Sequence, residues 1–82
     1  MKLKYDKVAD AIYIKLSDKP YAYGRDLDHE RRIDFGEDGV PLGVELLCVS
    51  CGVITDDLPH RSEIEKFLRE HDIKIYRSCV LT

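Results

Sequence analysis

The chain has no long hydrophobic run and no cluster of basic residues. None of its apolar stretches approaches the roughly 18 to 20 residues of a membrane-spanning helix, and residues 1–6 begin a strand pattern rather than the apolar region of a signal peptide. The net charge is −3, and acidic residues surround the arginines at positions 25, 31 and 32. Proteins that bind nucleic acids cluster lysine and arginine instead. We therefore expect a cytoplasmic protein that binds neither membranes nor nucleic acids.

Motifs for catalysis are also missing. The serines lack a G-x-S-x-G context, no glycine loop for phosphate is present, and the histidines are scattered: His29, His60 and His71. Glu45 is a candidate for acid–base work, but a strand neighbour, Arg32, is expected to hold it ionised as a cross-strand ion pair. The sequence predicts no catalytic or cofactor-binding residue. A small hydrolase or ligand-binding domain around Glu45 and the tyrosines is a third hypothesis that rests on residue types alone.

Cysteine is scarce, yet two of the three cysteines form a C-x-x-C: Cys48 and Cys51. Together with Cys79 and one histidine they make a weak candidate for a zinc site, and the pair alone is a candidate redox site. A structural zinc site normally shows a second paired motif, which is absent here. We therefore favour buried cysteines that act as small hydrophobic side chains, and the metal and redox hypotheses stay open.

The strongest pattern that is present predicts a hairpin over residues 31–49. Apolar and polar residues alternate on both sides of Asp38-Gly39, a dipeptide typical of hairpin turns. This turn predicts three cross-strand pairs: Phe35 with Leu42, Ile33 with Val44, and Arg32 with Glu45. Slipping the register by one residue would put Ile33 opposite Gly43 and lose that match, so we expect the register to be well specified.

Other strands are predicted over residues 2–6, 11–16 and 21–24, followed by a polar loop over residues 26–30. The first two strands are expected to pair with Tyr5 opposite Ile12 and Leu3 opposite Ile14. Ser62 and Glu65 form a capping box that predicts the start of a helix ending near His71. Residues 73–76 are expected to form a short last strand. We predict one α+β domain over residues 1–82, an antiparallel β-meander of about five strands with one C-terminal helix packed on one face.

Two features favour self-association. The strands over 11–16 and 42–49 carry apolar residues on both faces, which leaves apolar surface beyond what one helix can cover: Ala11, Tyr13, Leu47 and Val49 on the second face. A self-complementary dimer is the commonest solution. Charge is also uneven, because the first twenty residues are net basic and residues 25–45 carry three arginines against seven acidic residues. Such asymmetry steers a partner or a second copy of the chain.

The N-terminal part resembles a small prokaryotic family, domain of unknown function 2283. The resemblance rests on these segments: Tyr5-Asp6, Ala9 to Ile14, Ile33-Asp34-Phe35, Glu37-Asp38-Gly39 and Leu42 to Leu47, with a weaker match in the tail from Leu58 to Ile73. These are strand and turn residues, so the resemblance implies a fold and no reaction. It also suggests binding to a small protein, as in antitoxin-like pairs. The chain departs from the family pattern at Cys48 and Cys51.

Two hypotheses about function follow. The first is a non-enzymatic protein-interaction module that forms a homodimer and binds a small protein partner in an antitoxin-like role. The second is a metal- or redox-responsive small protein that uses Cys48, Cys51 and Cys79. The sequence leaves open whether the protein has any enzymatic activity.

Overall fold

The computed structural model describes residues 1–76, which belong to two compact units, Met1–Leu47 and the residues from Cys48 onward. The first unit contains five strands: β1 (Lys2–Asp6), β2 (Ala11–Lys15), β3 (Tyr23–Asp28), β4 (Arg31–Phe35) and β5 (Pro41–Leu47). The second contains a short 3-10 helix and three further elements: Val49–Cys51, β6 (Val53–Ile54), α1 (Arg61–Glu70) and β7 (Ile75–Tyr76). The elements confirm the α+β class. That residues 1–82 form a single domain stays a prediction.

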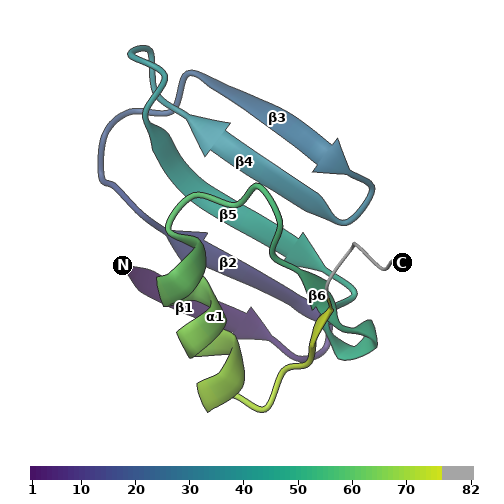
Figure 1. The fold of residues 1–82 in the computed structure, drawn as a ribbon. Coiled ribbons are helices and arrows are strands. Elements are labelled where there is room, and N and C mark those ends of the chain that lie inside the picture. Colours follow the sequence, from purple (N-terminus) through teal and green to yellow (C-terminus); the bar gives the residue numbers. More distant parts are fainter. Residues whose placement is uncertain (77–82) are drawn as a thin grey trace. The chain divides into compact units, whose positions relative to one another are not determined.

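The five strands form one antiparallel sheet in the order β1-β2-β5-β4-β3 (Figure 1). The order corrects the predicted meander, in which each strand would lie beside the next along the chain. The segment after β2 instead crosses to the far edge, and its first residues bond to β5, where Leu16 and Ser17 donate backbone N–H groups to the carbonyl of Leu42. β5 thereby takes the middle of the sheet, the position that best buries its apolar side chains.

The predicted register is confirmed in both hairpins. Tyr5 pairs with Ile12 and Leu3 with Ile14, and in the second hairpin Ile33 pairs with Val44 and Arg32 with Glu45. Phe35 was expected opposite Leu42 but pairs with Pro41, because the register shifts between Asp34 and Phe35. Gly39 adopts a φ of 79° in this turn, a conformation that glycine accepts without strain.

β3 is longer than predicted. It runs through Asp28, so the expected loop over residues 26–30 shrinks to the two-residue turn His29-Glu30. Two ion pairs hold this polar strand against β4, Asp26 with Arg32 at 3.1 Å and Asp28 with Arg31 at 2.9 Å. The pattern of apolar residues missed the strand because charged side chains stabilise it instead.

One face of the sheet is apolar. Its buried side chains are Ile12, Ile14, Ile33, Leu42, Val44 and Leu46. They alternate along β2, β4 and β5 with residues on the opposite face, as period two requires. The second face carries most of the charge, together with three of the four apolar residues predicted there, Ala11, Tyr13 and Leu47, whereas Val49 lies beyond the end of β5.

In the second unit, α1 ends as predicted, with His71 at its C-terminus, but it begins earlier than expected. His60 precedes the first turn without a side-chain cap, and Ser62 lies inside the helix, so the predicted capping box is wrong. Glu65 bonds elsewhere, to the hydroxyl of Thr55. The short last strand, β7, pairs in parallel with β6. Among residues 1–76, no helix has the length and apolar character to cross a membrane.

Candidate functional site on the polar face of the sheet

The face opposite the apolar core carries an ordered array of polar side chains. Strand pairing places two rows of residues across it, each read from β1 through β2, β5 and β4 to β3. The first row is Lys2, Lys15, Gly43, Asp34 and Gly24, and the second is Lys4, Tyr13, Glu45, Arg32 and Asp26. We call the surface formed by these ten residues the polar face.

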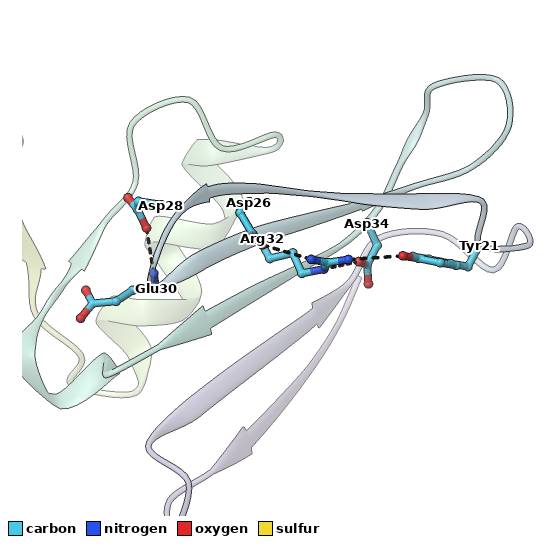
Figure 2. A network of polar contacts seen from close by, with 6 residues as sticks. All are labelled: Tyr21, Asp26, Asp28, Glu30, Arg32 and Asp34. Carbon is cyan, nitrogen blue, oxygen red and sulfur yellow. Dashed lines mark hydrogen bonds and ion pairs between the residues drawn. The ribbon is translucent and has the colours of Figure 1, made fainter.

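Asp34 is the centre of a hydrogen-bonded network on the polar face. The hydroxyl of Tyr13, from β2, donates to Asp34 Oδ2 at 3.0 Å, and Arg32 Nε lies 3.5 Å from Oδ1. The Arg32 guanidinium also donates to Asp26 Oδ1 at 3.1 Å and to the hydroxyl of Tyr21 at 3.4 Å (Figure 2). The network thus joins side chains from β2, β4, β3 and the segment before β3 around one carboxylate that is only 21% exposed.

Two glycines make room for this network. Gly43 and Gly24 flank Asp34 on the neighbouring strands. A Cβ atom at Gly43 would meet the hydroxyl of Tyr13, and one at Gly24 would meet the guanidinium of Arg32. Glycine in a strand often marks such a close approach. The Tyr13 and Arg32 side chains therefore lie flat over bare backbone instead of standing away from the sheet.

Near neutral pH, Tyr13 stays neutral and Arg32 stays positively charged. Partial burial, together with the hydrogen bond and negative charge of Asp34, raises the pKa of Tyr13 to about 12, so its hydroxyl remains a donor. Hydrogen bonds to Tyr21 and Asp26 raise the pKa of Arg32. Neither group is tuned toward proton exchange at pH 7, which a catalytic acid or base needs.

The predicted ion pair between Arg32 and Glu45 is wrong, although the two residues do pair in register. The Arg32 side chain turns away from β5 and pairs with Asp26 and Asp34, because Gly24 leaves space over β3. Glu45 is exposed and has no ion pair with any residue in the described range 1–76. It is an uncompensated charge in the middle of the polar face.

A shallow depression adjoins this face at the β3–β4 turn. It has a volume of about 450 Å³, and its lining is almost entirely charged: Asp26, Asp28, His29, Glu30, Arg31, Arg32, Glu45 and Leu47. Partial burial acts to raise the pKa of Asp28, but hydrogen bonds from the Glu30 backbone and from Arg31 outweigh it and lower that pKa. Figure 2 shows the Glu30 carboxylate directed away from the Arg32 network. The Asp28 carboxylate thus remains ionised at neutral pH.

Cys48 and Cys51 do not behave as predicted. Both side chains are exposed rather than buried, and Cys51 belongs to the 3-10 helix that Cys48 precedes. The strand predicted to continue to Val49 ends at Leu47, so the chain leaves the sheet before either cysteine. Cys79 lies outside the described residues. Within residues 1–76 no three His, Cys, Asp or Glu side chains gather closely enough to hold a metal ion.

The tyrosines of the third hypothesis, a hydrolase or ligand-binding site around Glu45, do not gather on one surface. Tyr5 shares the face of Ile12, whereas Tyr13 lies on the polar face. Tyr23 stacks on Phe35, with ring centroids 5.1 Å apart. The sequence did not predict the hydrogen bond between Tyr13 and Asp34 or the space that Gly43 leaves for the Tyr13 side chain. The available signal was the alternation that places Tyr13, Arg32 and Asp34 on one face.

The fold and this surface define a small α+β domain whose antiparallel sheet presents a polar, hydrogen-bonded face. The chain belongs to the family described as protein of unknown function DUF2283, whose model matches residues 2–50. The match confirms the family resemblance and covers the whole five-stranded sheet, so the polar face lies within the family domain. No curated protein and no solved structure shows a significant match to the chain.

Proposed function

We propose that this protein is a cytoplasmic protein-interaction module that acts as a homodimer. The observation that carries the proposal is the polar face, an open surface on which Tyr and Arg side chains are held in place. Tyrosine and arginine are the residue types most often found at the energetic centres of protein interfaces. An interface built from them needs no catalytic group.

Preorganisation strengthens this argument. Binding normally costs about 0.5 to 1.5 kcal/mol for each long side chain that becomes ordered. The Arg32 guanidinium is already held by Asp26, Asp34 and Tyr21, and the Tyr13 hydroxyl by Asp34. A partner that contacts these groups therefore meets side chains that have little freedom left to lose.

The oligomeric state tests the proposal. Sedimentation equilibrium and native mass spectrometry of the untagged protein should give twice the mass of the chain. Arg32→Ala should shift the equilibrium toward monomer, while Arg69→Ala, an exposed arginine on α1, serves as the matched control and should not. A strictly monomeric wild-type protein at high concentration would contradict the proposal.

A small protein partner is the second part of the proposal, in keeping with the antitoxin-like role that the family resemblance suggests. Co-expression with small proteins encoded beside the gene, followed by purification of a complex of defined stoichiometry, tests this role. A complex that survives Arg32→Ala unchanged would place the partner outside the polar face, where it can bind the homodimer. A complex that Arg32→Ala abolishes would mean that the partner and the second copy compete for the polar face.

The exposure of Cys48 and Cys51 favours one alternative, a redox- or metal-responsive protein. Exposed thiols three residues apart are accessible to oxidants and metal ions. Thiol titration in air and metal analysis of protein purified without chelator would distinguish this role. Thiols that stay reduced, in protein that carries neither zinc nor iron, would count against it.

A further inference from the structure

Charge is divided across the polar face. The half formed by β1 and β2 is basic, with three lysines and no acid in the two rows: Lys2, Lys4 and Lys15. The half formed by β3 and β4 is acidic, since Asp26 and Asp34 outnumber Arg32. β5 lies midway between the halves and contributes Glu45. The lysines and Glu45 are all exposed.

We infer that the polar face binds the same face of a second copy, with the two-fold axis along β5. The inference rests on the proposed homodimer and names its interface. A rotation of 180° about the middle strand exchanges the two halves, so each basic half lies on the acidic half of the other copy. Such a surface is self-complementary, as an isologous interface must be.

The strand register determines which residues of the two copies then lie opposite each other. Along the second row, Lys4 lies over Asp26 of the second copy and Tyr13 over Arg32 of the second copy. Along the first row, Lys15 lies over Asp34 of the second copy. The first and third contacts pair opposite charges, and the second places a guanidinium against an aromatic ring, which is also attractive.

The dimensions of packed sheets allow these contacts. Sheets that pack face to face lie about 10 Å apart with strand directions within about 30° of each other. The flat Tyr13 and Arg32 side chains of the two copies can stack on each other within such a gap, and the lysine side chains are long enough to cross it. Lys15 pairs with Asp18 in the single chain at 2.7 Å, but both residues are well exposed, and a surface pair of this kind exchanges partners at little cost.

The other in-plane axis, perpendicular to the strands, is unfavourable. This axis runs along the second row and would place each residue of that row opposite the same residue of the second copy: Lys4 on Lys4, Glu45 on Glu45, Arg32 on Arg32 and Asp26 on Asp26. Like charges placed directly opposite each other destabilise an interface. The charge pattern therefore selects the axis along β5.

The selected axis leaves one like-charge contact, because Glu45 lies on β5 and faces Glu45 of the second copy. Repulsion there opposes dimerisation, and Glu45→Gln should therefore tighten the dimer by about two- to fivefold, the range of one exposed charge pair. An interface elsewhere on the molecule would show no such gain. This variant leaves the Asp34 network intact, since Glu45 makes no ion pair within residues 1–76.

Charge reversal of one predicted contact provides the main test. Lys4→Glu and Asp26→Lys should each weaken the homodimer by about fivefold or more, because each creates two like-charge contacts. An equimolar mixture of the two variants should restore a dimer that contains one copy of each, since both contacts regain opposite charges. Lys66→Glu on α1 is the control and should dimerise like the wild type. Circular dichroism should show that all variants are folded.

Native mass spectrometry distinguishes the outcomes. A wild-type monomer would defeat the proposed function itself. A wild-type dimer whose affinity does not change with Lys4→Glu, Asp26→Lys or Glu45→Gln would support the homodimer but overturn this interface. Oligomers of three or more copies in the mixture would also contradict this interface. They would indicate that the β1 edge of one copy pairs with the β3 edge of the next. A mixed dimer, together with a tighter Glu45→Gln dimer, supports it.

Discussion

Asp34 shows how single residues shape the surface of this sheet. Its carboxylate receives the Tyr13 hydroxyl from one side and faces the Arg32 guanidinium on the other, and a glycine lies beneath each of those side chains. The glycines have no strand propensity of their own, so their presence in β3 and β5 is explained by what lies above them.

Gly43→Ala tests this explanation. The new methyl group would displace the Tyr13 ring and break its hydrogen bond to Asp34, so we expect the free energy of unfolding to fall by about 1 to 2 kcal/mol. In a Tyr13→Ala background the same change should be neutral or slightly stabilising, because alanine is better than glycine in a strand when nothing lies above it. Urea denaturation of the four proteins measures the coupling. Additive effects would show that Tyr13 does not lie over Gly43.

Tyr13 should titrate later than an ordinary tyrosine. Its pKa is raised from 10.0 to about 12, first by burial and then by Asp34, so absorbance at alkaline pH should show a late component that Tyr13→Phe removes. Because the folded-state pKa lies above that of the unfolded chain, the stabilisation is complete below pH 10 and is lost as the pH rises toward 12. Asp34→Asn should move the component to lower pH. A Tyr13 that titrates near pH 10 in the folded protein would rule out this environment.

At the scale of elements, α1 is stabilised differently from what its sequence suggests. The residue before the helix, His60, has a left-handed backbone with φ of 53° and makes no side-chain cap. The first turns instead connect to the preceding loop, where the fully buried Thr55 donates its hydroxyl to Glu65, and Arg61 pairs with both Glu65 and Asp56. These contacts attach the helix to its own loop.

Thr55→Val should therefore cost more than Ser62→Ala. The first removes a hydrogen bond to a carboxylate and should lower the free energy of unfolding by about 1 to 2 kcal/mol. The second removes no cap and should stay within about 0.5 kcal/mol, whereas a true N-cap serine would cost about 1. Thermal and urea unfolding measure the loss of stability in each variant. A larger loss of stability for Ser62→Ala than for Thr55→Val would support the predicted capping box instead.

The effect of Thr55→Val should also depend on pH. The Thr55 hydroxyl, followed by Arg61, lowers the pKa of Glu65 from its usual 4.5, so this stabilisation is present above pH 4.5 and is lost as the pH falls through the lowered value. The difference between wild type and variant should accordingly shrink in acid. Replacing Glu65 by Gln should remove most of that dependence.

At the scale of the whole molecule, the division of charge between the two halves of the polar face decides how copies associate. Screening should weaken such an interface, because the Debye length falls from about 8 Å at physiological ionic strength to about 3 Å at 1 M. We expect the dissociation constant of the dimer to rise by at least about threefold over this range, measured by sedimentation equilibrium. A dimer that tightens in high salt would indicate an apolar interface instead.

The sequence by itself determined the α+β class, the register of both hairpins and the two faces of the sheet. These follow from local alternation and turn chemistry, which act over a few residues. Leu3, Tyr5, Ile33 and Val44 lie opposite the expected partners for that reason.

Only the tertiary structure decided the strand order, the extent of β3 and the network around Asp34. Strand order depends on which edge the segment after β2 reaches, and that choice depends on burying β5 rather than on any local pattern. The network needs Tyr13 from β2 to meet Arg32 and Asp34 from β4 over Gly43 and Gly24. Residues so far apart in the chain become neighbours only when the sheet assembles, which is why the predicted Arg32–Glu45 ion pair gave way to contacts across the glycines.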